Sequence, residues 1–211
     1  MARPIYEFVE KMTRQGNREF FRRCAERVRE FNLTAHGHFD YTEEAIARQK
    51  GFVKEELMTE LLIDGIKDEN RTLVIDALCD IFVVATYWEF ITTLQDILEN
   101  QEFDGTFDEA VKWAIDSTDD SLDLRITSTE SLSDQVFYMT NGYSGDYPPQ
   151  VVCSCVAFMN SADFDYVRAL EEVLSSNESK IPTLEEFIAT GPANVSLEEI
   201  NRMYNSIRLQ R

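Results

Sequence analysis

Two stretches of this sequence each combine a helical pattern of apolar residues with a pair of carboxylates four residues apart. The first, KEELMTELL, holds Glu56 and Glu60, and the second, VIDALCDIFVVA, holds Asp76 and Asp80. Positions four apart lie within about 40° of each other around an α-helix, so each pair projects from one side. The apolar residues expected on the same sides are Phe52, Val53 and Ile63 for the first pair, and Val83 and Tyr87 for the second. Both pairs are therefore expected on faces that a globular protein normally buries.

Carboxylates on a buried face need a balancing positive charge. An ionised carboxylate without a partner is strongly penalised in a protein interior, and two acids four residues apart repel each other. No Lys, Arg or His occurs between Leu73 and Trp88, so the charge has to come from elsewhere in the fold or from a divalent metal ion. Four carboxylates without a thiolate or imidazole suit Mg²⁺ or Mn²⁺ better than Zn²⁺. The alternative is a pair of surface helices whose acids are solvated in the ordinary way.

Local signals predict that the two stretches are neighbouring antiparallel helices. Thr42 is a good N-cap for a helix that continues to about Ile66. The sequence KDENR then makes a turn, and Asn70 or Thr72 can cap a second helix that continues to Leu98. Helices joined by so short a connection pack antiparallel, so the two carboxylate pairs are expected to face one another.

These motifs, in this order, resemble those of the all-α nucleoside triphosphate pyrophosphohydrolases, the MazG-like group with its dimeric dUTPase and phosphoribosyl-ATP pyrophosphohydrolase relatives. That family carries EExxE on one helix and ExxD on the next. Here the first motif is Glu56-Leu-Met-Thr-Glu60, with Leu57 at the position of the second Glu. The second is Asp76-Ala-Leu-Cys-Asp80, similar to the DALAD form of some members. A later stretch, EEVLSSNESK, looks like the family's EVxxSNxSK element.

The resemblance implies an all-α fold with a four-helix-bundle core of the MazG-like type. It places residues 1–211 in a single domain, with an inserted segment at about 100–160. It implies Mg²⁺, or Mn²⁺ in its place, as the cofactor. The metal ligands carried over are Glu56, Glu60, Asp76 and Asp80. Either Glu56 or Glu60 is then the catalytic group that orients or deprotonates the attacking water. The substrate-binding residues carried over are Asn177, Ser179 and Lys180.

The resemblance further implies a homodimer or larger homo-oligomer that hydrolyses a nucleoside triphosphate, preferably a deoxynucleotide, to the monophosphate and pyrophosphate. The alternative is a degenerate bundle that has lost the chemistry and acts as a nucleotide-binding or protein-interaction module. Leu57 in place of an acid favours the module, whereas Lys180 at a phosphate-binding position favours the enzyme. Asn177 and Lys180 also have an ordinary interpretation, because both residue types are common at helix C-termini.

Composition narrows the remaining function classes. A formal charge of −19 argues against nucleic-acid binding, since a phosphate backbone would be repelled. No apolar run is long enough to span a bilayer and the N-terminus lacks a signal-peptide core, so a cytoplasmic location is expected. The four cysteines lack metal-ligand spacing and are expected to be reduced core thiols. His36 and His38 have no third ligand nearby, which disfavours zinc.

The other expected elements are less strongly marked. A helix over about 17–31 has a basic face, interpreted as a salt-bridged surface, with contact to a partner subunit or a triphosphate as the alternative. Residues 32–41 are expected as a loop, 107–115 as a short helix and 116–123 as a solvated acidic linker. Residues 132–139 suit a helix or a strand, 141–149 a turn, and 150–176 two helices or one broken near Ser161. Capping boxes at Thr183 and Ser196 each predict a short helix.

Overall fold

The computed structural model describes residues 3–123, 131–162 and 165–180. Within these ranges the chain forms seven α-helices and one π-helical segment, and it contains no β-strand. In chain order the elements are α1 (Arg3–His36), α2 (Glu43–Lys54), η1 (Glu55–Lys67), α3 (Arg71–Glu99), α4 (Phe107–Asp123), α5 (Leu132–Ser144), α6 (Pro148–Ser161) and α7 (Tyr166–Glu178). The predicted all-α class is confirmed, whereas the type of bundle is not identified.

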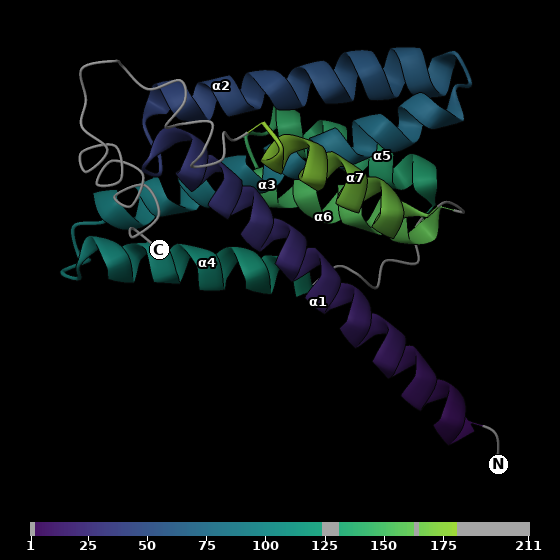
Figure 1. The fold of residues 1–211 in the computed structure, drawn as a ribbon, viewed down its shortest axis with the longest axis horizontal. Coiled ribbons are helices and arrows are strands. Elements are labelled where there is room, and N and C mark those ends of the chain that lie inside the picture. Colours follow the sequence, from purple (N-terminus) through teal and green to yellow (C-terminus); the bar gives the residue numbers. More distant parts are fainter. Residues whose placement is uncertain (1–2, 124–130, 163–164, 181–211) are drawn as a thin grey trace.

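Helix α3 is the centre of the molecule (Figure 1). It packs against η1, α6, α4, α2, α7 and α1, which explains why it is apolar on nearly all sides. Its largest fully buried side chains include Phe82, Trp88 and Phe90, and burying a side chain of this size stabilises the fold by roughly 2 to 3 kcal/mol. Asn70 is the N-cap, because its Oδ1 accepts a hydrogen bond from the Leu73 backbone N–H at 3.3 Å. The predicted start and length of this helix are confirmed.

Helix α2 passes without a break into η1, and together they form one long rod antiparallel to α3 (Figure 1). Thr42 caps the rod as predicted, since its Oγ1 accepts a hydrogen bond from the Ala45 N–H at 3.2 Å. The rod ends at Lys67, close to the expected Ile66. In η1 the turns are wider, with hydrogen bonds that span five residues, and such segments often occur at functional sites.

The wide turns decide which side of η1 is buried. The buried residues are Leu57, Leu61 and Gly65, and they are four positions apart because a π-helix has more than four residues in each turn. Glu56 and Glu60 each precede a buried residue by one position, so their half-buried side chains lie along the edge of the buried stripe. Leu57, at the position of the family's second Glu, is a fully buried core residue.

Two apolar residues expected beside the carboxylates are on the outside of the rod. Phe52 and Ile63 are 44% and 45% exposed, so the prediction that they share a buried side with the acids is wrong, while Val53 is buried as expected. For Ile63 the prediction assumed α-helical turns, which η1 does not have, whereas Phe52 belongs to α2 and lies beside the buried Val53. A glycine allows the rod to approach α3 closely, because a Cβ at Gly65 would lie 2.9 Å from Val74 Cγ2.

The acidic tract over 116–123 is helical, and its interpretation as a solvated linker is wrong. It forms the second half of α4, which ends at Asp123. Two positions four apart, Thr118 and Leu122, are buried, and the Thr118 hydroxyl donates a hydrogen bond to the Ala114 carbonyl at 2.9 Å. Asp119 forms an ion pair with Arg29 of α1 at 3.0 Å. The tract is therefore an amphipathic helix whose charged side includes a contact with α1.

The region predicted as an insertion also contains α5 and α6. Residues 132–139 are part of a helix, α5, which begins with a capping box between Ser131 and Asp134 and continues to Ser144. The turn expected from residue 141 is therefore shorter. Helix α6 begins with Pro148 in its first turn, and its residues 151–159 are buried. It packs against α3 and α5, so this part of the chain contributes to the core. Of the two alternatives for 150–176, the pair of helices is confirmed.

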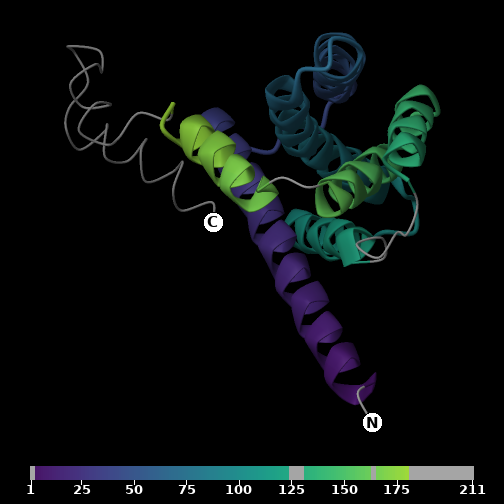
Figure 2. The same cartoon turned by 90° about the vertical axis from the view of Figure 1, so that its right-hand side faces the viewer.

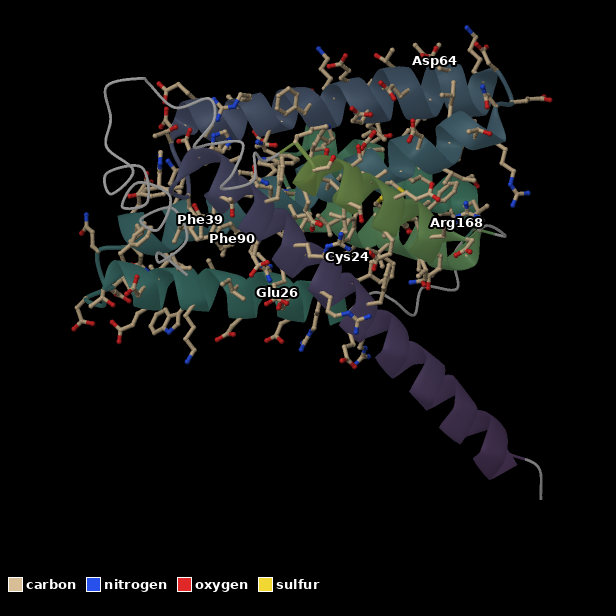
Figure 3. The ribbon with its side chains drawn as sticks, in the orientation of Figure 1. Cys24, Glu26, Phe39, Asp64, Phe90 and Arg168 are labelled. Atoms are coloured by element: carbon tan, nitrogen blue, oxygen red, sulfur yellow. The ribbon has the colours of Figure 1, made fainter. Side chains whose placement is uncertain are left out.

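Helix α1 is longer at both ends than the predicted 17–31. It ends at His36, and the next residue, Gly37, forms a glycine C-cap with a positive φ of 74° and an N–H bond to the Leu33 carbonyl. The expected loop therefore starts at residue 37. Within it, Phe39 packs on Phe90 of α3 with ring centroids 4.8 Å apart (Figure 3).

Helix α7 lies along α1 on one side of the molecule, in both Figure 1 and Figure 2. The basic side of α1 forms ion pairs with α4 and α7, which confirms the salt-bridged surface that the sequence favoured. The capping boxes at Thr183 and Ser196 lie outside the described residues. In the described part of the chain, no helix has the length and hydrophobicity needed to cross a bilayer.

Candidate functional site

The four predicted carboxylates come from η1 and α3, which pack against each other. Glu56 is the most perturbed of them. Burial raises its pKa to about 8, and the negative charges of Asp80 and Glu60 contribute to the increase. Its Oε2 atom is buried and has no hydrogen-bond partner among the described residues, and a contact with the Glu60 side chain also raises its pKa. A buried acceptor without a partner is costly, so this carboxyl group lies in a place where a proton or a cation would be favourable.

Asp80 is affected by the same cluster. Burial raises its pKa to about 6, the charges of Asp76 and Glu60 raise it further, and the positive charge of Lys180 opposes the shift. Asp80 is half-buried and Asp76 is exposed. The prediction of buried carboxylates on α3 therefore holds in part for Asp80 and is wrong for Asp76, which lies near the solvent-facing start of the helix.

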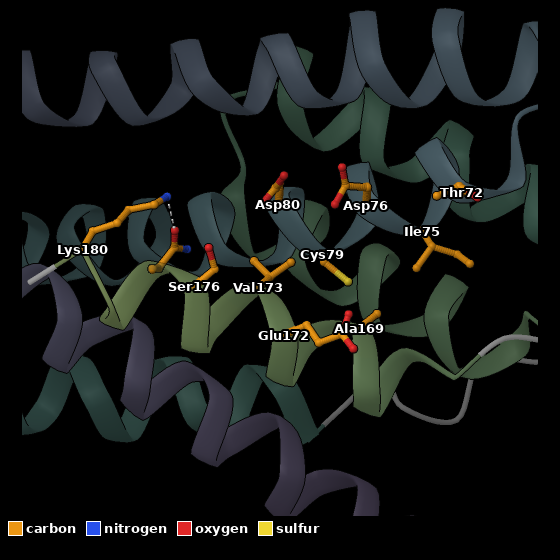
Figure 4. A pocket seen from close by; sticks show the side chains of 11 residues that line it. Thr72, Ile75, Asp76, Cys79, Asp80, Ala169, Glu172, Val173, Ser176 and Lys180 are labelled. Atoms are coloured by element: carbon orange, nitrogen blue, oxygen red, sulfur yellow. Dashed lines mark hydrogen bonds between the residues drawn. The ribbon is translucent and has the colours of Figure 1, made fainter.

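A pocket of about 460 Å³ lies between α3 and α7. Its lining residues are Thr72, Ile75, Asp76, Cys79 and Asp80 from α3, and Ala169, Glu172, Val173, Ser176, Asn177 and Lys180 from α7 and the residues that follow it. In Figure 4, Asp76 and Asp80 project from the α3 side and Lys180 reaches toward them from the end of α7. The pocket thus joins two motifs that are 97 positions apart, from Asp80 to Asn177.

The pocket has two unlike ends (Figure 4). Lys180 lies at one end, Thr72 and Ile75 lie at the other, and the carboxylates of Asp76, Asp80 and Glu172 lie between them. Thr72 and Asp80 are eight residues apart on α3, which corresponds to about 12 Å along the helix axis. The pocket can therefore accept an elongated molecule with an anionic group near Lys180 and an uncharged group near Thr72.

Two of the three predicted substrate-binding residues line this pocket, and the third does not. Lys180 Nζ donates a hydrogen bond to Asn177 Oδ1 at 2.9 Å. Ser179 is not part of the pocket lining, and its Oγ donates to the Ser176 carbonyl at 2.7 Å, which satisfies a carbonyl at the end of α7. These residues do lie at a helix C-terminus, so their ordinary capping role and a position at the pocket coexist.

Sequence reasoning missed several lining residues, chiefly Glu172, Ser176 and Thr72. Helical spacing is the signal that points to two of them. Ser176 and Glu172 precede Lys180 by four and eight positions, so all three lie along one side of α7 as it ends. Glu56 and Glu60 do not line the pocket. The charge of Glu60 nevertheless raises the pKa of Asp80, and the charge of Asp80 raises the pKa of Glu56.

The carboxylates fit Mg²⁺ by chemistry, and their present positions leave them apart. All four donors are hard oxygens, and the unpartnered Glu56 Oε2 together with the raised pKa of Asp80 indicates negative charge that lacks compensation. Among the described residues, however, no three His, Cys, Asp or Glu side chains are close enough together to hold a metal ion. The carboxylates would therefore have to converge when an ion binds.

The cysteines are buried and free, as predicted for reduced core thiols. Cys79 lines the pocket, but burial and the charges of Asp80 and Asp76 raise its pKa to about 12, so the thiol stays protonated near neutral pH. Cys155 Sγ donates to the Leu78 carbonyl at 3.1 Å. No thiolate nucleophile is therefore available at the pocket.

His38 Nδ1 lies 3.1 Å from the His36 carbonyl, and both residues are far in sequence from those that line the pocket.

A search of family models, of curated proteins and of solved structures finds no match to this chain.

Proposed function

We propose that this protein is a Mg²⁺-dependent nucleoside triphosphate pyrophosphohydrolase with a MazG-like bundle. One observation carries the proposal: a single pocket is lined by Asp76 and Asp80 on α3 and by Asn177 and Lys180 at the end of α7. Acids that suit a divalent cation and a lysine that suits a phosphate serve together in the binding of a polyphosphate and its counter-ion. The sequence motifs alone do not require these groups to share a cavity.

The two ends of the pocket support a particular orientation of the nucleotide. The phosphates lie at the end that holds Lys180. Among the described residues that line the pocket, Lys180 is the one with a positive charge. The nucleoside then extends past Asp76 and Glu172 toward Thr72 and Ile75, the uncharged residues at the far end. Lys180 acts as a point charge on the phosphates, and Asn177, which accepts its hydrogen bond, holds the lysine in place.

Glu56, Glu60, Asp76 and Asp80 are the residues that would hold the ion. Mg²⁺, when bound, neutralises the polyphosphate charge and lowers the pKa of a coordinated water. Without such compensation, the net charge of −19 would repel the substrate. Glu56 or Glu60, whichever the ion engages less fully, would orient or deprotonate the attacking water.

A second candidate function rests on its own observations. Leu57 is fully buried at the position of the family's second Glu, and the described acids are not close enough together to form a ready metal site. Both facts favour a degenerate bundle that binds a nucleotide or another protein without hydrolysis. The pocket and its lysine would serve such a module equally well.

The identity of the products decides between the two functions. The protein should be incubated with Mg²⁺ and each of the eight common ribo- and deoxyribonucleoside triphosphates, and phosphorus NMR should be used to identify the products. The enzyme is expected to release the monophosphate and pyrophosphate, with a deoxynucleotide preferred. Release of orthophosphate with the diphosphate would contradict this reaction, and binding without turnover of any of them would favour the module.

The homo-oligomer that the family resemblance implies is part of the proposal. Analytical ultracentrifugation of the whole chain at micromolar concentration is the direct measurement. A dimer or larger species is expected, and a monomer at all concentrations would contradict it.

A further inference from the structure

One arginine of α1 connects this helix to the end of α7 that carries the proposed phosphate-binding residues. Arg27 donates two parallel hydrogen bonds to Glu178, from Nε to Oε1 at 2.6 Å and from Nη2 to Oε2 at 2.9 Å. It also pairs with Glu171 and donates to Ser175 Oγ at 3.3 Å. Two-pronged arginine–carboxylate pairs are among the stronger hydrogen-bonded contacts and fix direction as well as distance. One side chain of α1 thus forms hydrogen bonds with three residues of α7, which are 144 to 151 positions away in the sequence.

The last turn of α7 contains no fully buried side chain. The fully buried side chains of this helix are Leu170 and Leu174, and residues 175–180 are exposed or half-buried. At its start, Tyr166 stacks on Phe21 of α1 with centroids 5.5 Å apart and planes 10° from parallel. The helix therefore has an aromatic anchor at its first residue and a hydrophobic anchor up to Leu174, and the polar contacts of Arg27 continue the attachment beyond that point.

Two of the α7 residues that Arg27 contacts, Ser175 and Glu178, are next in sequence to residues that line the pocket. Glu178 immediately follows Asn177 and precedes Lys180 by two positions, and Ser175 immediately precedes Ser176. The charge of Lys180 acts on Asp80 across the pocket, so displacement of the last turn of α7 would move the lysine away from the α3 carboxylates. The Arg27 side chain is only 24% exposed, which limits how much water competes for its hydrogen bonds.

We infer that Arg27 is a positioning residue for the nucleotide site: it fixes the last turn of α7 so that Asn177 and Lys180 face the carboxylates of α3. This role rests on the proposed function, because it acts through the proposed phosphate contact of Lys180. Arg27 itself is absent from the pocket lining and acts only through α7. A lysine in its place would keep the positive charge and lose the two-pronged pairing with Glu178.

The test uses the whole chain and four variants. Arg27→Gln removes the positive charge that pairs with Glu178. Glu178→Gln removes the negative charge of the same pair. Arg27→Lys keeps the positive charge and loses the two parallel hydrogen bonds. Arg23→Gln is the matched control, because Arg23 lies on the same helix and pairs with Glu19 of that helix at 3.6 Å. Two measurements are made on each. The first is amide hydrogen exchange over residues 175–180. The second is calorimetric binding, with Mg²⁺, of the α,β-imido analogues of the eight common nucleoside triphosphates, and the analogue that the wild type binds most tightly is used to compare the variants.

In Arg27→Gln and Glu178→Gln, exchange should increase over 175–180 while the amides of α3 stay as protected as in the wild type. Nucleotide affinity should fall about tenfold, the value of roughly one charge-assisted hydrogen bond. Arg27→Lys should lose less affinity than Arg27→Gln, and Arg23→Gln should resemble the wild type. A variant that fails to fold would lose protection from hydrogen exchange throughout α3. If this happens to Arg27→Gln, then Glu178→Gln provides the test, and the reverse also holds.

The outcomes separate this inference from the function on which it rests. Unchanged exchange over 175–180, or increased exchange with unchanged affinity, would overturn the role of Arg27 and leave the proposed function intact. Failure of the wild type to bind any of these analogues would overturn the proposed function and the positioning role together. Equal loss of affinity in Arg23→Gln would also overturn the role, since it would show a general effect of positive charge on α1.

Discussion

Replacing Glu56 with Gln should stabilise the folded protein when no metal is present. The carboxyl group is half-buried, its Oε2 has no hydrogen-bond partner, and burial with the charges of Asp80 and Glu60 raises its pKa to about 8, from an ordinary value of 4.5. Above pH 4.5 the unfolded chain releases this proton, whereas the folded chain keeps it. That difference costs about 1.4 kcal/mol of stability for each pH unit, so ~3 kcal/mol at pH 7.

The sign of the pH dependence follows from the direction of the pKa shift. Since the folded pKa is the higher one, the stability associated with Glu56 is fully present below pH 4.5 and is lost as the pH rises to about 8. Partial exposure to solvent reduces the penalty, so we expect a gain of ~1 to 2 kcal/mol for Glu56→Gln at pH 8. At pH 5 the two proteins should differ by less than about 1 kcal/mol, because this pH is only half a unit above the pKa of 4.5 in the unfolded chain.

Urea unfolding at pH 5 and pH 8, with EDTA present, measures this difference directly. Glu55→Gln is the matched control, because Glu55 is the adjacent and exposed acid of η1, and its replacement should change stability much less. Asp80→Asn should behave like Glu56→Gln with a smaller gain, since the pKa of Asp80 is raised only to about 6. Both variants should lose pyrophosphate release in the presence of Mg²⁺. If Glu56→Gln is no more stable than the wild type at pH 8, or if its gain is as large at pH 5, the carboxylate cluster is not strained as argued.

Three further predictions concern other parts of the molecule. Gly65→Ala should destabilise the protein by ~1 to 3 kcal/mol in urea unfolding, because its Cβ would lie 2.9 Å from Val74 Cγ2. The control, Gly51→Ala, lies in open space on the same rod and should stabilise the protein by ~0.5 to 1 kcal/mol. Equal effects of the two substitutions would refute the close approach of η1 and α3. Lys180→Ala should weaken binding of the imido nucleotide at least tenfold in calorimetry, and unchanged affinity would support the ordinary helix-end interpretation. Since all four cysteines are buried and the pKa of Cys79 is about 12, a thiol reagent at pH 8 should label the chain only after denaturation, and rapid labelling of the native protein would contradict this burial.

Local patterns in the sequence were sufficient to predict the all-α class and much of the central helical hairpin. The N-caps Thr42 and Asn70 and the length of α3 follow from hydrogen bonds and periodicity that span a few residues. The same is true of the carboxylate spacing on η1 and α3. Such features depend on chain neighbours, so they are encoded close to where they act. The four acids and the late Asn177 and Lys180 were likewise visible as residues without any knowledge of the fold.

The tertiary structure decided how these residues are used. Uniform helical periodicity predicts that Ile63 is buried, whereas the wider turns of η1 bury Leu57 and Leu61 and leave Ile63 exposed. The acidic tract over 116–123 contains too few apolar residues to predict a helix, yet packing of α4 on α3 and the ion pair with Arg29 stabilise one. Burial and ion pairing depend on which elements pack together, and no short-range signal reports that.

The same reasoning separates the two halves of the candidate site. By itself, the sequence determined which side chains carry charge and at what spacing they occur on each helix. Only the tertiary structure brought Asp80 and Lys180 to one pocket across about a hundred positions of chain, with Arg27 of the first helix attached to the last turn of α7. The physical reason is that helical order arises from hydrogen bonds within four or five residues, whereas the relative placement of helices is set by contacts between residues far apart in the chain.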